Sequence, residues 1–241
     1  MNTTLKKIAY TLLCSAAFVN SYAIGNTAKR SEIGYSIPTV KADYTLILLD
    51  TTVNEHVTTK GGFGVIFGNS INLSKLGNDG ALQIGIDGMF DLLVWDLSPV
   101  NKTYSSYSGY STDYEITGGT MRIGVPISAD IKYGAEATLN KKKRGIFTFG
   151  VGMVPTAALT AYNGDAGAKI KVQPFIKAEL GIVAGIGFKL RMQYNMGKFQ
   201  YINLKPETDY NVGSAGLVGT NSVTFSLVLM PFGFAWKNFD W

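Results

Sequence analysis

The chain has 241 residues, a formal net charge of +5, 28 glycines, 12% aromatic residues and only 16% charged residues. About 25% charged residues is usual for a soluble domain. Basic residues are scattered rather than gathered on one face, which argues against nucleic-acid binding. The only cysteine is Cys14, so a mature chain that lacks it has neither disulfides nor thiolate metal sites.

The N-terminus has the three parts of a secretory signal peptide in order. Lys6 and Lys7 are followed by an apolar stretch from Ile8 to Val19 and then by small residues that end at Ala23. The apolar stretch is shorter than the roughly 20 residues of a membrane-spanning helix. We therefore expect residues 1–23 to be cleaved and residues 24–241 to form one domain.

From there on, apolar residues recur at every second position, which indicates β-strands. The first strand illustrates the pattern, because Val40, Ala42 and Tyr44 alternate with Lys41 and Asp43. Eight strands are predicted, at 38–49, 61–74, 80–96, 115–134, 146–160, 168–181, 185–197 and 220–236. Ten remain possible, because Pro126 interrupts the long fourth segment and the turn near 181–185 is required only by length.

The intervening segments are alternately long and short along most of the chain. A closed antiparallel barrel whose N-terminus is periplasmic has short periplasmic turns and longer extracellular loops. The segments 97–114 and 198–219 would then be extracellular. The basic run Lys141–Arg144 would lie in a periplasmic turn, where a cationic run is less natural than beside the phosphates of the outer leaflet.

Alternation alone also fits a soluble barrel. The Gly-, Ser- and Thr-rich polar faces favour a membrane barrel, with apolar faces towards lipid and polar faces towards a narrow interior. Aromatic residues near the strand ends and at the C-terminus favour it too. The sequence thus predicts an all-β, up-and-down antiparallel transmembrane β-barrel in the cell outer membrane.

The signal, the alternating strands and the aromatic C-terminus resemble small outer-membrane barrels of the OmpA/OmpX type. Members of that class commonly end in an aromatic residue that the barrel-assembly machinery reads, and Phe239 and Trp241 match this pattern in part, although Lys237 interrupts it. The resemblance is architectural and implies no functional residue. It implies as partners the assembly machinery, outer-membrane lipid and lipopolysaccharide, with the protein a monomer.

Charged residues on the polar faces are the main candidates for an internal site. In an eight-stranded barrel they would form a salt-bridged plug, and in a wider barrel they could line an anion-preferring path. The predicted lumen-facing residues are Asp87, Asp91, Arg122, Asp130, Lys169, Lys171, Lys177, Glu179, Lys189 and Arg191.

His56, the only histidine, is the one candidate catalytic residue. We place it in the first extracellular loop, where it could act as a general base. Some outer-membrane lipid A-modifying enzymes resemble this arrangement. Serines of the next long loop could approach His56, although no motif links them, namely Ser105, Ser106, Ser108 and Ser111. The acidic pairs Asp113/Glu115 and Glu207/Asp209 lack EF-hand spacing, so no metal or cofactor is expected.

The sequence therefore favours a non-enzymatic barrel with a structural, surface-contact or adhesion-type role that uses its long loops, which are rich in Tyr, Ser, Gly, Asn and Thr. Three alternatives stay open: a small passive pore, a lipid A-modifying enzyme that uses His56, and a soluble periplasmic barrel that binds an apolar ligand.

Overall fold

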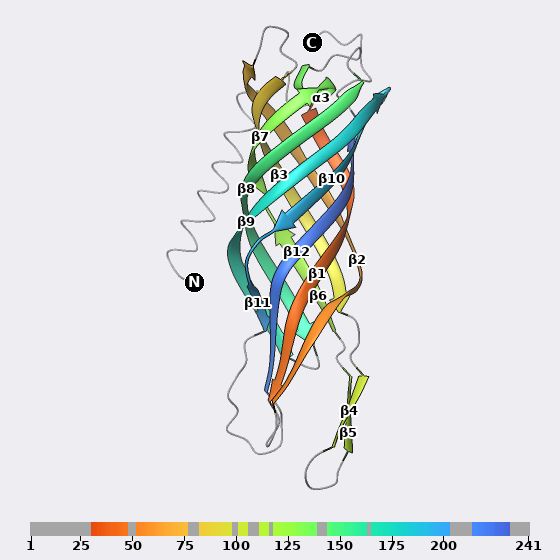
Figure 1. Ribbon diagram of the computed structural model, residues 1–241, viewed down its shortest axis with the longest axis vertical. Helices are drawn as coiled ribbons and strands as arrows, with labels where there is room; N and C mark the ends of the chain where they lie inside the picture. Colours follow the sequence, from red (N-terminus) through yellow and green to blue (C-terminus); the bar gives the residue numbers. More distant parts are fainter. Residues whose placement is uncertain are drawn as a thin grey trace.

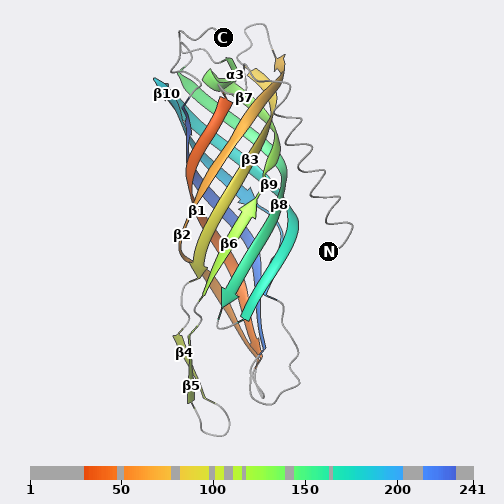
Figure 2. The ribbon, with the colours of Figure 1, turned by 180° about the vertical axis from the view of Figure 1, so that it is seen from behind.

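The computed structural model describes residues 30–47, 52–76, 82–97, 101–105, 111–115, 118–138, 144–162, 165–202 and 214–231. The described strands form an elongated antiparallel barrel (Figures 1 and 2). Its wall consists of β1 (Ser31–Ile47), β2 (Thr52–Leu76), β3 (Leu82–Leu97), β6 (Gly118–Gly124) with β7 (Ile127–Gly134), β8 (Gly145–Tyr162), β9 (Asp165–Ala184), β10 (Ile186–Asn195) and β12 (Ser214–Met230). Among the described residues, no helix is long and apolar enough to span a membrane.

The barrel is closed by the pairing of its first and last strands. β1 and β12 run antiparallel from the Ile33–Leu229 pair to the Ile47–Ser214 pair. Closure leaves no open sheet edge along the pairing, as a strand surrounded by hydrocarbon requires. With β6 and β7 sharing one position, the described wall has eight strand positions, in agreement with the prediction of eight. The number is even, so β1 begins and β12 ends at the same end of the barrel.

Pro126 produces a bend within one wall position and does not add a strand. β6 and β7 lie end to end, and both pair with β3 on one side and with β8 on the other. Proline has no amide hydrogen for the ladder, and here its carbonyl accepts from the Met89 amide at 2.9 Å. The Val125 amide donates to the Pro155 carbonyl at 3.0 Å, so pairing resumes on both sides of the bend.

The turn that sequence length required near 181–185 is also present. β9 and β10 are paired up to Ala184 and Ile186, and Gly185 between them has a φ of +82°. That conformation is unfavourable for residues with a Cβ atom. A single glycine therefore separates two strands within what reads in the sequence as one uninterrupted alternation.

The predicted first loop is wrong for most of its length. Residues 52–60 belong to β2, and they continue the pairing with β1 as far as Thr52 opposite Ile47. His56 consequently lies on a wall strand and not in a loop. The third connection carries a separate hairpin of β4 (Asn101–Ser105) and β5 (Ser111–Glu115), and the seventh carries β11 (Phe199–Ile202), which pairs with β12.

The two ends of the barrel differ in what they carry. A short helix, α3 (Ala135–Thr138), lies at the end where β1 begins, and the β4–β5 hairpin projects from the opposite end (Figure 1). Short turns are periplasmic and long loops extracellular in barrels of this kind. The α3 end is therefore assigned to the periplasm. Arg144, the described residue of the Lys141–Arg144 run, is exposed at this end, where its carbonyl accepts from Val183.

The inward face changes character along β1 and along β3. On β3 the inward residues pass from Gln83 and Asp87 near the α3 end to Leu93 and Trp95 near the hairpin end, and all four are buried. On β1 the order is Glu32 and Ser36, followed by Val40, Ala42 and Tyr44. The barrel therefore contains a polar layer in its periplasmic half and an apolar layer in its extracellular half.

This change corrects the predicted facing of the first strand. Val40, Ala42 and Tyr44 are at most 2% exposed and point into the barrel, whereas Lys41 is exposed on the outside. Nearer the periplasm the same strand exposes Ile33, Tyr35 and Ile37 at 50–54%. Even-numbered residues point inward along the whole of β1. The apolar residues lie on the outer face near the periplasm and on the inner face nearer the extracellular end.

Candidate functional site

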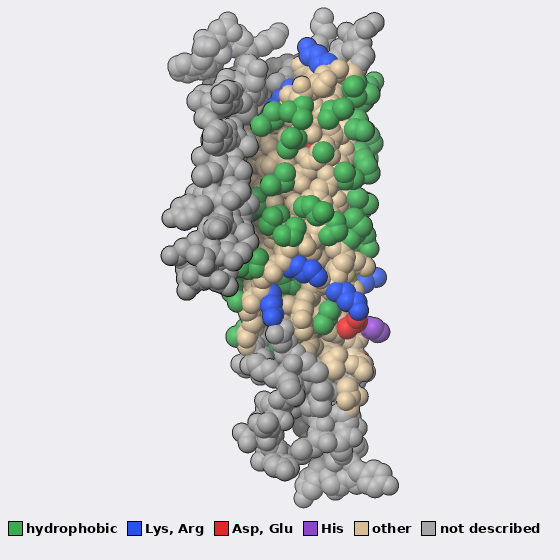
Figure 3. Space-filling view, turned by 90° about the vertical axis from the view of Figure 1, so that its left-hand side faces the viewer, with side chains coloured by type: hydrophobic (Ala, Val, Ile, Leu, Met, Phe, Trp, Pro, Cys, Tyr) green, Lys and Arg blue, Asp and Glu red, His purple; other side chains and the backbone are tan. Residues whose placement is uncertain are grey.

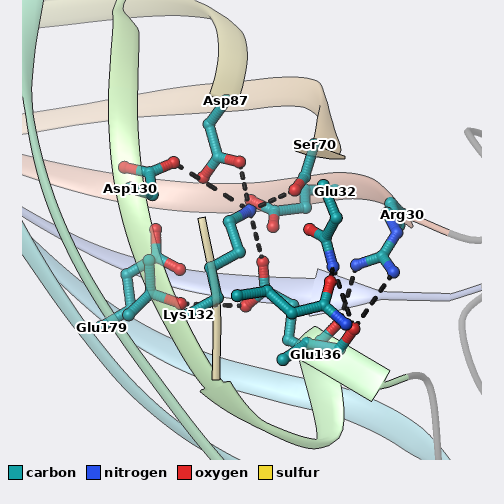
Figure 4. A network of polar contacts seen from close by, with 12 residues as sticks. Arg30, Glu32, Ser70, Asp87, Asp130, Lys132, Glu136 and Glu179 are labelled. Carbon is teal, nitrogen blue, oxygen red and sulfur yellow. Dashed lines mark hydrogen bonds and ion pairs between the residues drawn. The ribbon is translucent and has the colours of Figure 1, made fainter. Parts of the chain in front are cut away.

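The periplasmic half of the lumen holds a network of buried acids and bases (Figure 4). Neighbouring strands and α3 each contribute inward-facing charges at about the same level. The acids are Glu32 of β1, Asp87 of β3, Asp130 of β7, Glu136 of α3 and Glu179 of β9, and the bases are Lys132 of β7, Lys177 of β9, and Lys189 and Arg191 of β10. We call these nine residues the ionic plug.

Lys132 and Lys177 link the acids on one side of the plug. The Lys132 ammonium contacts Asp87 and the Ser70 hydroxyl, and it lies 2.9 Å from Glu136. Lys177 is 2.5 Å from the other oxygen of Asp87 and 3.2 Å from Asp130. Both carboxylate oxygens of Asp87 are thereby neutralised by cations from different strands.

Lys189 and Arg191 link the acids on the other side. Lys189 contacts Glu32 and lies 2.7 Å from Glu179 and 3.1 Å from Glu136. Arg191 holds Glu32 at 2.7 Å through Nη2 and Glu179 at 2.5 Å through Nε. Each cation therefore bridges at least two carboxylates, as buried charges require if desolvation is to be offset.

One acid of the ionic plug, Glu136, belongs to α3 and not to a wall strand. Gly134, with a φ of +89°, turns the chain from β7 into α3, and Glu136 is then fully buried. Two side chains hold the α3 carbonyls: Asn72 Nδ2 of β2 donates to Ala137 at 2.9 Å, and Arg30, which precedes β1, donates to Glu136 at 2.6 Å. α3 thus closes the lumen at its periplasmic end.

Glycine makes room for these side chains. Gly150 of β8 pairs with Asp130 on one side and with Lys177 on the other. A Cβ atom at Gly150 would lie 1.9 Å from Asp130 Oδ1 and 2.8 Å from Lys177 Cε. At this position a glycine on the polar face therefore accommodates the charged side chains of both neighbouring strands.

The plug is close to neutral and leaves little for a cation to bind. Glu32, Asp87, Glu136 and Glu179 offer oxygens within 4.8 Å of one another, which is close enough for a metal site. The ammonium groups of Lys132 and Lys189 contact these same carboxylates, however. Four buried cations face five buried acids, and Arg30 at the edge adds a further positive charge.

Between the plug and the extracellular half lies a separate buried ion pair. Arg122 Nη2 donates to Asp91 Oδ2 at 2.9 Å. Beyond it begins an apolar cluster, which we call the apolar plug, formed by Val40, Ala42, Tyr44, Val57, Leu93, Trp95, Ala158, Phe199, Tyr201, Ile202 and Leu217. Trp95 of β3 meets Tyr201 of β11 edge to face at 5.9 Å between ring centroids, so this layer joins distant parts of the wall.

Eight of the ten predicted lumen-facing residues are buried inside the barrel, either in the ionic plug or in the Arg122–Asp91 pair. Lys169 and Lys171 are the exceptions, being half-buried and exposed, respectively. They share the inward parity of β9, but the β9–β10 ladder ends at the Phe175–Asn195 pair. Lys171 reaches the surface there and donates to the Lys198 carbonyl at 2.5 Å.

Sequence reasoning did not select Glu32, Lys132 or Glu136 as site residues. Lys132 lies on the polar face of a predicted strand, and its parity with Asp130 was a usable signal. Glu32 precedes the predicted first strand, although its alternation with Ile33, Tyr35 and Ile37 extends that strand backwards. Glu136 carries no such signal, because it follows a glycine turn and belongs to a four-residue helix.

His56 is exposed on the outer face of β2. Its Nδ1 lies 2.5 Å from Asp43 Oδ1, directly across the β1–β2 pair. Ser105 is the backbone pairing partner of Ser111 in the separate β4–β5 sheet. Over the residues that the structure describes, these serines and His56 are therefore on different sheets. Ser106 and Ser108 lie outside the described residues, as do Phe239, Trp241 and the predicted signal peptide.

The outside of the barrel carries a broad apolar band (Figure 3). Its members come from every long wall strand and include Phe63 at 57%, Phe149 at 44%, Leu190 at 67% and Phe225 at 52% exposure. A closed antiparallel barrel with an apolar band outside and charges inside is the architecture of bacterial outer-membrane proteins. The chain is thus a transmembrane β-barrel of the outer membrane, and this outward band contradicts the alternative of a soluble barrel.

No protein-family model and no curated protein sequence matches the chain. Among solved structures it is similar to Neisserial surface protein A (NspA), at 10% identity and a TM-score of 0.36 over 81% of this chain and 94% of NspA. It is also similar to Ail, the attachment invasion locus protein of Yersinia pestis, at 11% identity and a TM-score of 0.28 over 81% of this chain and 99% of Ail. At these identities and scores the likenesses carry no information on function.

Proposed function

We propose that the protein is a closed, non-enzymatic barrel that does not conduct, and that it acts at the cell surface through its extracellular hairpin and loops. The observation that carries this proposal is the filling of the lumen by two different layers. The ionic plug and the apolar plug lie in series, so a solute would have to cross both. A rigid closed barrel is then a scaffold for what projects from it.

The contacts within the ionic plug argue against conduction, in addition to its buried charge. A conducting path needs sites that an ion can enter and leave. Here each cation already bridges carboxylates on other elements, as Lys189 does with Glu136 at 3.1 Å and Glu179 at 2.7 Å. An entering ion would have to displace these contacts in an interior where an unpaired charge is costly.

The apolar plug adds a second barrier of a different kind. Trp95, Tyr201 and Phe199 are each at most 4% exposed, and their rings contact one another. A dry apolar constriction blocks ions because water and ions are unfavourable there. The small-pore alternative would require both layers to move.

The extracellular end supports the surface role. β4 and β5 form a two-stranded sheet of their own that projects beyond the barrel (Figure 2). The loop that carries them is rich in Tyr, Ser and Gly, a composition that suits adaptable contact surfaces. A contact role for this hairpin is the specific form of the proposal.

Two measurements test the proposal. The full-length protein, folded and inserted into planar bilayers, is expected to give no conductance steps at several voltages, with a general porin as the positive control for insertion. Reproducible steps from the wild-type chain would overturn the closed lumen.

The hairpin is tested separately on cells that express the full chain. Replacing residues 101–115 with a Gly/Ser linker should reduce adherence to cultured epithelial cells and between bacteria, while the heat-modifiable gel mobility of the barrel stays unchanged. Unchanged adherence of that variant, in cells where the wild-type chain promotes adherence, would refute the role of the hairpin.

A further inference from the structure

One stretch of the extracellular wall is held differently from the rest. The β9–β10 ladder ends at the Phe175–Asn195 pair, and the Met196 amide makes one further bond to the Pro174 carbonyl at 2.9 Å. Pro174 has no amide hydrogen with which to continue the ladder. Beyond this point β11 takes the place of β10 beside β12 (Figure 1). In the described sheet β11 is a terminal strand that pairs with β12 alone.

On one side β11 is held by a short ladder. Its pairing with β12 consists of three residue pairs between Phe199 and Ile202, and the register shifts before Ile202. By comparison, β10 pairs with β12 without interruption from Gly187 to Asn195. β11 is also the shortest of the described strands. A short element with few ladder bonds opens at a lower free-energy cost than the long strands of the wall.

On the other side, two side chains of β9 reach the segment that leads into β11. Gln173 Nε2 donates to the Gly197 carbonyl at 3.0 Å, and Lys171 Nζ donates to the Lys198 carbonyl at 2.5 Å. These bonds stand where the β9–β10 ladder has already ended. They hold the start of β11 against β9 and can be removed without altering the backbone.

Gly197 provides a pivot at the start of this segment. Its φ is +91°, which is unfavourable for a residue with a Cβ atom. No atom lies within 4 Å of the position that a Cβ would take there, and both Gly197 and Lys198 are exposed. Gln200 of β11 is exposed as well. The chain therefore has an open outer side at the point where it turns into β11.

The inner side of β11 covers the apolar plug. Phe199, Tyr201 and Ile202 are at most 5% exposed, and they belong to the same apolar cluster as Ala158 and Leu217. The ionic plug consists of residues on other elements. Outward movement of β11 would therefore remove three members of the extracellular layer and leave the periplasmic layer unchanged.

We propose that β11 is a hinged cover of the apolar plug, which swings outward about Gly197 and returns. In the open position water reaches the extracellular half of the lumen, while the ionic plug keeps the lumen closed to conduction. This inference goes beyond the proposed function. Its failure would leave the closed lumen and the role of the hairpin untouched, because those depend on other elements and are measured by conductance and adherence.

The test follows the accessibility of a cysteine placed beneath β11 in the full chain. Ala158→Cys, in a Cys14→Ser background, puts the only thiol at a position that is 2% exposed in the apolar plug. The probe is a small charged methanethiosulfonate, and labelling under native conditions is followed by mass spectrometry. Leu217→Cys, opposite Ile202, is a second reporter. Ser226→Cys, on the inward face of β12 beside the ionic plug, reports on the rest of the barrel.

Two changes should open the cover. Lys171→Met with Gln173→Leu should raise the labelling rate of the Ala158→Cys reporter roughly tenfold, because two hydrogen bonds of the closed position are lost. Gly197→Ala should also raise it, because a Cβ atom disfavours the observed φ. The matched control is Lys41→Met with Lys75→Met, two exposed lysines on other strands, which should leave the rate unchanged.

A disulfide tests the opposite direction. Gln200→Cys with Val218→Cys joins two directly paired residues of β11 and β12, and its oxidation should slow labelling at position 158 at least tenfold until it is reduced. The inference is overturned if both opening variants, verified as folded by their gel mobility, label like the unchanged reporter, or if the locked strand labels as fast as the reduced one. It is equally overturned if Ser226→Cys is accelerated as much, because the whole barrel would then loosen.

Discussion

Removing the ammonium of Lys189 is the sharpest perturbation of the ionic plug. This side chain is completely buried and contacts Glu32, Glu136 and Glu179. In Lys189→Met the carbon stem is approximately kept and the charge is lost, so five buried acids face three buried bases. Breaking a buried ion pair by removing one partner costs about 3–5 kcal/mol. We expect a loss of that size in the free energy of unfolding.

The assay is unfolding of the full-length barrel by urea, followed by gel mobility without boiling and by tryptophan fluorescence. Lys75→Met, which removes an exposed lysine, is the matched control and should change stability by less than about 0.5 kcal/mol. Adding Glu136→Gln to Lys189→Met should restore part of the loss, because it removes one of the buried negative charges that are then in excess. A cost below about 1 kcal/mol for Lys189→Met, or a further loss in the double variant, would refute the plug as described.

Three further changes probe other parts of the structure. Gly150→Ala should lower the free energy of unfolding in urea by about 1–3 kcal/mol, because its Cβ would overlap Asp130 Oδ1. Gly88→Ala is the control and should not destabilise the barrel, because nothing lies within 4 Å of its Cβ position. Equal effects of the two substitutions would contradict this packing. Trp95→Ala should lower the free energy of unfolding by about 3–5 kcal/mol in the same assay, because it empties the centre of the apolar plug, and a near-neutral result would mean that this layer is loosely packed. His56→Asn should leave both the unfolding midpoint and the lipid A profile of expressing cells unchanged, because His56 is a highly exposed partner of Asp43; an altered lipid A profile would instead support the enzymatic alternative.

The wall could be predicted from the sequence because strand parity is a local property. Alternation indicated eight strands, and each overlaps an observed wall position, including the bend at Pro126. The predicted strand boundaries are wrong where a strand continues through polar residues. Residues 52–60 read as a loop because they are polar, yet they pair with β1 as far as Thr52. Strand pairing outside the membrane does not need an apolar outer face, so hydropathy underestimates the length of the extracellular wall.

The site could be predicted only in part, for a different reason. Parity selects residues that point inward, and eight of the ten chosen charges are buried. It does not show where a ladder ends, so it predicts Lys171 in the lumen although the pairing of β9 with β10 ends at Asn195. Nor does it foresee Glu136, whose burial depends on α3 folding back across the lumen and on Arg30 and Asn72 holding its carbonyls.

The reversal of the inner face along β1 and β3 follows from the surroundings of the wall. Where lipid covers the outside, outward residues must be apolar, and the inward polar side chains must satisfy one another because little water reaches them. Where water covers the outside, the wall is stabilised as a soluble barrel is, by apolar residues inside. Ser36 and Val40 occupy the same inward parity on one strand, yet Ser36 meets Ser226 through a hydrogen bond and Val40 belongs to the apolar plug. On β1 the inner face therefore changes from polar to apolar between Ser36 and Val40, beside the level at which the outward apolar residues end at Ile37.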